Sequence, residues 1–191
     1  MSGMTLTTFS NPGKPRGARF AGPVALLLAL LAAGCASPVA DTLRSAADAG
    51  SVPPGLVLVW DDHDPKWGGH RITVRGGGEV EVRGWRPGTP QAEPEVWTGQ
   101  VAEAEIADLV DLLVRIEAWE QRVDDEFTPL DEARATLTLR IDGARERVWE
   151  WANDLEANQR LILVENRLEA LVRAARSGAA SDRSVPPSSE P

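Results

Sequence analysis

The chain contains very little cysteine and serine, and this limits its chemistry. Cys35 is the only cysteine among 191 residues, so an internal disulfide cannot form even in an oxidising compartment. No serine lies between Ser51 and Ser177. A serine or cysteine nucleophile is therefore excluded from that long central stretch, and with it the usual acyl-transfer triads. The sequence also lacks a P-loop and a glycine-rich dinucleotide motif at a strand-to-helix junction. We expect a protein that is not an enzyme.

An apolar run lies near the start of the chain, and it is short. Residues 21–33, AGPVALLLALLAA, follow a segment that carries Lys14, Arg16 and Arg19 and no acid. The run is too short to span a bilayer comfortably, which takes about 20 residues. A basic segment, a short apolar run and small residues before a cut site are typical of a secretory signal. We therefore predict a signal peptide over residues 1–34.

The end of this run, LLAAGC, resembles the lipobox of bacterial lipoproteins. The matching positions are Leu31, Ala32, Ala33, Gly34 and Cys35, with leucine one place further from the cysteine than is usual. The resemblance implies that the chain is cut before Cys35 and that the cysteine thiol is diacylated. It also implies a further acyl group, such as palmitate, on the new amino terminus. Two or three acyl chains give stable membrane anchoring where one would not.

The same resemblance implies a place in the bacterial cell envelope. Aspartate after the cysteine favours retention at the inner membrane, and this chain has Ala36 there. We expect the outer membrane, facing the periplasm, in a cell with two membranes. Without the three basic residues of the signal, the mature chain has 17 basic and 29 acidic residues, a net charge of −12. Because this charge repels nucleic acid and anionic lipid, we expect no nucleic-acid partner, and we expect attachment to the membrane through the lipid anchor and not through a basic patch.

Two stretches of small and polar residues flank the predicted domain. Residues 35–54 start at the lipidated cysteine and then contain small and polar residues with prolines, which predicts a flexible tether. Residues 177–191 have the same character and predict a disordered tail. The folded part is then a single domain over 55–176, which is long enough for one modest core.

The hydrophobic pattern within 55–176 predicts an α+β domain. Strands are indicated at 56–60, 70–75, 79–85, 133–141 and 144–151, with a short edge strand at 96–101. An apolar stripe predicts a helix over 102–119, and a loop follows over 120–132. A second helix is expected from Asn153, with Glu156 completing a variant capping box, to about residue 175. The order β-β-β-(β)-α-β-β-α favours an antiparallel sheet of about five strands with two helices packed on one face.

Two segments, DEARATLTLRIDG at 131–143 and VWEWANDL at 148–155, resemble a recurring family of small uncharacterised bacterial domains. Many of these domains are carried on lipoproteins, and the resemblance covers about residues 55–172. A similar β-rich plan occurs in small bacterial metalloprotease inhibitors. The first resemblance implies an α+β domain and the second a protease-inhibitor-like module. Neither implies a catalytic residue.

One polar segment, WDDHDPKWGGH at 60–70, holds both histidines of the chain. Five of its side chains are able ligands for a divalent metal such as zinc: Asp61, Asp62, His63, Asp64 and His70. If the flanking strands pair, Asp61 or Asp62 approaches His70, whereas His63 is less constrained. Alternatively, the segment is only a hairpin loop, because aspartate, proline and glycine turn the chain and stay solvated. In that interpretation His70 shares a strand face with Ile72 and Val74.

The chain has seven tryptophans and no tyrosine. Trp149 and Trp151 fall on the same strand face as Arg147, whereas Val148 alternates to the other face. If Val148 points at the helices, the tryptophan pair lies on the helix-free face and could stack on a sugar or receive a protein partner. Alternatively, the pair is structural, either in the core or under arginine side chains through cation–π contact.

These features predict a membrane-anchored cell-envelope lipoprotein that acts as a non-catalytic binding or accessory module. Its partner would be an envelope protein or a glycan, bound on the sheet face or at the 60–70 loop. One alternative is a metal-binding protein or small metal-dependent hydrolase that uses the same loop. A protease-inhibitor-like module is the other.

Cys35→Ser is expected to abolish lipidation, because serine lacks the thiol that forms the thioether. Intact-protein mass spectrometry should find two or three acyl chains on the wild-type protein and none on the variant, and the neighbouring substitution Ala36→Ser should keep them. A Cys35→Ser protein that is still acylated and processed as before would refute the lipoprotein prediction.

Overall fold

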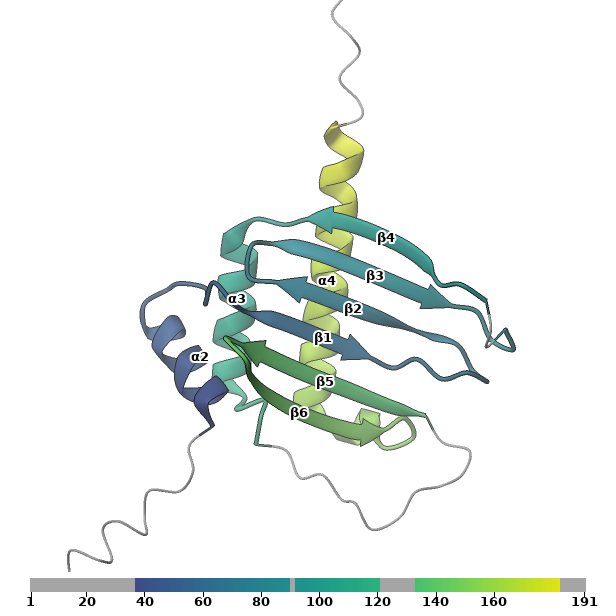
Figure 1. Cartoon of the computed structure of the whole chain (residues 1–191), viewed down its shortest axis with the longest axis horizontal. Helices are drawn as coiled ribbons and strands as arrows, with labels where there is room; N and C mark the ends of the chain where they lie inside the picture. The colour runs from purple at the N-terminus through teal and green to yellow at the C-terminus, as the bar shows by residue number, and fades with distance from the viewer. Residues whose placement is uncertain (1–36, 90–91, 121–132, 183–191) are drawn as a thin grey trace, which may run out of the picture. The chain divides into compact units, whose positions relative to one another are not determined.

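The computed structural model describes residues 37–89, 92–120 and 133–182. Within them, six strands form one antiparallel sheet with three α-helices on one of its faces (Figure 1). The α+β class and the one-sided packing of helices agree with the sequence prediction. The predicted signal peptide, Cys35, all but Glu120 of the predicted 120–132 loop and the end of the predicted tail lie outside the described residues.

The sheet has the strand order β4-β3-β2-β1-β5-β6, and every neighbouring pair is antiparallel. The strands are β1 (Val57–Asp61), β2 (Gly69–Arg75), β3 (Glu79–Trp85), β4 (Glu95–Gln100), β5 (Arg134–Ile141) and β6 (Ala144–Trp151). The predicted edge strand is β4, which pairs along β3 and makes the sheet six strands wide. Asp142 and Gly143 join β5 to β6 with φ values of 48° and 86°, the two positive values that a type I′ hairpin needs.

The core lies between the sheet and the helices α2 (Pro38–Asp48), α3 (Glu103–Arg115) and α4 (Gln159–Asp182). Alternate strand residues such as Leu58, Leu137 and Leu139 point into it and are buried. The predicted apolar stripe of α3 is confirmed by four buried side chains: Ile106, Leu109, Val110 and Leu113. The sheet and both predicted helices therefore follow from local hydrophobic periodicity.

Helix α2 corrects the prediction of a flexible tether over 35–54. The Oγ of Ser37 accepts a hydrogen bond from the Ala40 backbone N–H at 3.3 Å, and Pro38 occupies the first turn. Both features favour a helix start. Val39, Leu43 and Ala46 recur at helical spacing and are buried in the same core as the sheet. The segment from Pro38 to Asp48 is thus part of the folded domain.

The start and end of the last helix also differ from the prediction. After β6 the chain makes a turn and a short 3₁₀ helix, Leu155–Ala157, so α4 does not begin at Asn153. The side chain of Asn158 accepts a hydrogen bond from the Leu161 N–H at 3.2 Å and caps α4 instead. The helix continues to Asp182, so the prediction of a disordered tail is wrong for residues 177–182.

Leu43→Ala tests whether α2 belongs to the core. Because Leu43 is fully buried, we expect the substitution to lower the free energy of unfolding by about 2–4 kcal/mol, measured by urea denaturation. Ser45→Ala, on the exposed side of the same helix, should change it by less than about 0.5 kcal/mol. Equal, small effects of the two substitutions would mean that the segment is a tether after all.

Candidate functional site

The sheet face opposite the helices is not covered by any helix or loop of the described residues (Figure 1). We call it the open face. Side chains from five strands surround a shallow hollow of about 500 Å³ on it: Val57, Val59, Asp61, Arg71, Thr73, Arg75, Glu81, Arg83, Thr136, Thr138, Arg140, Arg145 and Arg147. These residues occupy the alternate positions that do not point into the core, because successive strand side chains face opposite sides.

The open face is positively charged although the chain as a whole is acidic. Six arginines and two acids line the hollow, whereas the whole chain has a net charge of −9. The net charge of the chain therefore does not describe this surface. The arginines of β2, β3, β5 and β6 come from separate parts of the chain and converge only when the strands pair in register.

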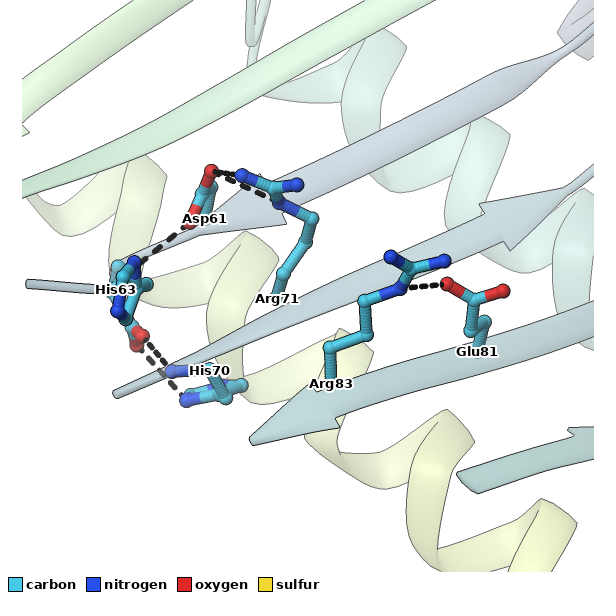
Figure 2. Close-up of polar contacts among 7 residues, drawn as sticks. Asp61, His63, His70, Arg71, Glu81 and Arg83 are labelled. Atoms are coloured by element: carbon cyan, nitrogen blue, oxygen red, sulfur yellow. Dashed lines mark hydrogen bonds and ion pairs between the residues drawn. The ribbon is translucent and has the colours of Figure 1, made fainter. Parts of the chain in front are cut away.

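Five of the six arginines around the hollow fall into two groups, and the sixth, Arg75, pairs with Glu79 at 3.4 Å. At one end, Arg71 donates from Nε to Asp61 at 3.0 Å, and Arg83 donates to Glu81 at 2.6 Å (Figure 2). At the other end, three exposed arginines make no hydrogen bond or ion pair within the described part of the chain. We call these three the arginine triad: Arg140, Arg145 and Arg147. The triad therefore carries positive charge that no described acid neutralises.

The tryptophan pair lies next to the triad on β6. Val148 is buried in the core, so Trp149 and Trp151 lie on the helix-free face, and their rings meet edge-on at 5.1 Å. The Arg134 guanidinium lies 4.2 Å and 4.3 Å from the two ring centroids. Trp149 is only 8% exposed. This arrangement favours a structural, cation–π role for the pair over the stacking of a sugar.

Asp62 and His70 come together at the base of the 60–70 loop, as one interpretation of the sequence predicts. One Asp62 oxygen accepts a hydrogen bond from the His70 backbone N–H at 2.6 Å, and the other lies 3.1 Å from the His70 Nδ1. Because the carboxylate binds both the ring and the backbone of His70, it fixes the pairing of the strand ends.

The remaining candidate metal ligands point elsewhere. The His63 ring packs on Trp85 with 4.1 Å between centroids, and Asp61 pairs with Arg71. Asp64 accepts hydrogen bonds from two backbone N–H groups of its own turn, at 2.7 and 2.9 Å. Across residues 37–89, 92–120 and 133–182, no three His, Cys, Asp or Glu side chains are placed to hold a metal ion. The contacts are those of a hairpin loop.

The Asp62–His70 pair shifts the pKa of both partners. Burial raises the pKa of Asp62, but hydrogen bonds from the His70 side chain and backbone outweigh it, so the pKa falls below 3.8. The hydrogen bond to Asp62 raises the pKa of His70 above 6.5, although burial opposes it. Burial, with the nearby negative charge of Asp62, raises the pKa of Glu165 on α4 above 4.5. His70 lies on the same face of β2 as the buried residue Ile72, and both line a hollow with Glu169 of α4, so His70 faces the helix side of the sheet.

Comparison of the chain with protein-family models, with curated proteins and with solved structures finds no match. Among the described helices, none is both long enough and apolar enough to cross a membrane. The function must therefore be argued from the chemistry of the open face and of the Asp62–His70 pair.

We expect the Asp62–His70 pair to stabilise the domain most between about pH 4 and pH 6.5. The lowered pKa of Asp62 gives stability that is present above pH 3.8 and is lost as the pH falls through its folded value. The raised pKa of His70 gives stability that is present below pH 6.5 and is lost as the pH rises through its folded value. His70→Asn should therefore lower the free energy of unfolding by about 1 kcal/mol near pH 5.5, and by less at pH 8.5.

Urea denaturation of the two proteins across this range measures the difference. In an Asp62→Asn background the greater effect of His70→Asn at pH 5.5 than at pH 8.5 should be lost or reversed, because the hydrogen bond that raises the pKa of His70 is gone and burial, which lowers it, remains. A loss that is the same at pH 5.5 and pH 8.5 in the wild-type background would contradict the assigned ion pair.

Proposed function

We propose that the protein is a membrane-anchored lipoprotein of the bacterial cell envelope, and that its domain is a non-catalytic binding or accessory module. The open face is the binding surface. One observation carries this proposal: a side of the sheet left uncovered by the described residues holds three arginines that have no partner among those residues, in an otherwise acidic chain. A solvated face is normal for an antiparallel sheet, but uncompensated charge of one sign on it is not needed for folding.

The chemistry of the open face supports binding rather than catalysis. No histidine, cysteine or serine lines its hollow. Its two carboxylates, Asp61 and Glu81, are each held by an arginine, so neither is poised to act as a general base. Arginine and threonine instead supply hydrogen-bond donors to a ligand.

If Cys35 is lipidated, the early start of helix α2 would hold the folded domain close to the membrane. Only Ala36 and Ser37 separate the cysteine from the first residue of α2. Three residue steps span at most about 11 Å. The domain would then be held at the bilayer surface, and its binding surface with it, in place of the long tether that the composition predicts.

The metal-dependent alternative has less support. The structure brings together only Asp62 and His70 of the candidate ligands, and a zinc site needs three or four protein ligands. Further ligands would have to come from another molecule or from residues outside the described ranges.

Site-specific photo-crosslinking in living cells tests the proposed binding surface. A photoreactive residue at Thr73, within the hollow of the open face, should give a defined crosslinked adduct. The same residue at Leu163, which is exposed on α4, serves as the matched control and should give none. Adducts from Leu163 alone, or none from either position, would refute the open face as the binding surface.

A further inference from the structure

The arginine triad places like charges at positions where they repel each other. Arg140 and Arg145 are directly opposite in the β5–β6 register, and their Cβ atoms are then about 5 Å apart. Like charges at such positions are destabilising. Arg71 and Arg83 are also directly opposite, but Asp61 and Glu81 compensate them. The triad lacks such acids within the described residues, so a bound anion would supply the missing charge.

The arginines of the open face extend in a row across the sheet. Val57 is opposite both Arg140 and Arg75, so one row runs Arg145, Arg140, Val57, Arg75 across four strands. Three strand spacings make this row about 14 Å long. Such a row is longer than one phosphate or carboxylate group, and the hollow is open rather than enclosed. The geometry therefore suits a linear ligand with several negative charges.

A second row adds a neutral hydrogen-bond donor beside the first. Arg147 is opposite Thr138, and Val59 is opposite both Thr138 and Thr73. Arg147 lies about 7 Å from Arg145 along β6, so the triad has charges in both rows. Thr73 is half-buried and can donate to an oxygen of the same ligand, whereas Thr138 is buried.

The pairing of two arginines favours phosphate over carboxylate. A guanidinium binds either group through two parallel hydrogen bonds. One such arginine uses both oxygens of a carboxylate, whereas a phosphate offers further acceptor oxygens to a second arginine. Arg140 and Arg145 are close enough to share one group, and phosphate satisfies both.

The negative charge of the rest of the protein favours a single polymer chain over a flat membrane as the ligand of the open face. The side chains of the hollow contribute +4, so the remainder of a mature chain of net charge −12 contributes −16. A flat anionic bilayer would also face acids of the open face such as Glu79 and Glu81, and it would be repelled by them. A single polymer chain that lies along the β5–β6 end of the open face meets the triad, whereas Glu79 and Glu81 lie at the β3 end of the two rows.

We infer that the open face binds a linear, phosphate-bearing polymer, and that Arg140, Arg145 and Arg147 contact its phosphates. This inference rests on the proposed function, because it names the chemistry of the ligand of the same surface. The triad provides the charge and Thr73 provides a neutral donor, whereas Arg75 is paired with Glu79 at 3.4 Å.

Binding of an inorganic polyphosphate to the full-length lipoprotein in non-ionic detergent tests the inference. Fluorescence anisotropy of labelled polyphosphate is followed between 50 and 300 mM salt. We expect the triple variant R140Q/R145Q/R147Q to bind at least tenfold more weakly. The slope of log affinity against log salt should fall by about 2, because each contact with a single strand contributes about 0.7.

A charge-matched variant controls for net charge. R115Q/R160Q/R173Q removes three exposed arginines from the helix side, and its affinity should stay within about threefold of the wild type. The triad variant should unfold at a urea concentration no lower than the wild type, because repulsion between Arg140 and Arg145 is relieved. A lower midpoint for that variant, or equal polyphosphate binding by both triple variants, would overturn the assignment of the triad.

Two further probes distinguish other occupants. Polyglutamate of matched charge should bind at least tenfold more weakly than polyphosphate, and tighter triad-dependent binding of polyglutamate would replace the inference with an acidic protein. Phosphatidylglycerol vesicles are compared with phosphatidylcholine vesicles, so that the contribution of the lipid anchor cancels. A triad-dependent preference for phosphatidylglycerol without polyphosphate binding would point to the bilayer and overturn the inference.

The polyphosphate-binding experiment and the photo-crosslinking experiment can fail independently of each other. Adducts from Thr73 without polyphosphate binding would keep the open face as a binding surface and refute the phosphate ligand. Triad-dependent polyphosphate binding without Thr73 adducts in cells would support the ligand chemistry and refute the proposed cellular role.

Discussion

One-sided burial of the sheet is the constraint on which the rest of the structure depends. Strand residues such as Leu58 and Leu137 pack under the three helices, and their neighbours Val59 and Thr138 face the other way. Because the side-chain period of a strand is two, a slip of one residue would exchange the two faces. Burial of the core face therefore also holds the arginines together on the open face. The proposed binding surface follows from the same register that forms the core.

Much of the fold could be predicted from the sequence because its signals are local. The alternation in β5 and β6, the Asp142–Gly143 turn and the apolar stripe of α3 each depend on residues near each other in the chain. Helix α2 escaped prediction because its buried side contains alanines and few larger residues. So short a helix is marginal by itself, and it is stabilised here by packing against the core. The start of α4 was missed because Asn153 and Asn158 both resemble caps.

The candidate site could be predicted only in part, because some of its contacts join residues from strands that are distant in the sequence. The hairpin between β1 and β2 brings Asp62 to His70, and this contact follows from the local sequence. His63 packs instead on Trp85, which comes from another strand and has no nearby signal. The basic face could not be predicted from the net charge of the chain, because the net charge does not show where charged side chains cluster. The Arg140–Arg145 pair is the exception, since the hairpin turn alone places these two residues opposite each other.

Arginine-selective chemical modification of the full-length protein, followed by mass spectrometry, tests the open face most directly. The account predicts that Arg140, Arg145 and Arg147 are modified as fast as Arg115, which is exposed on α3. All four should be modified faster than Arg167, whose side chain is 23% exposed and bound to Glu105. If the triad is protected as strongly as Arg167, another part of the protein covers this face, and the central claim of an open, basic binding surface is contradicted.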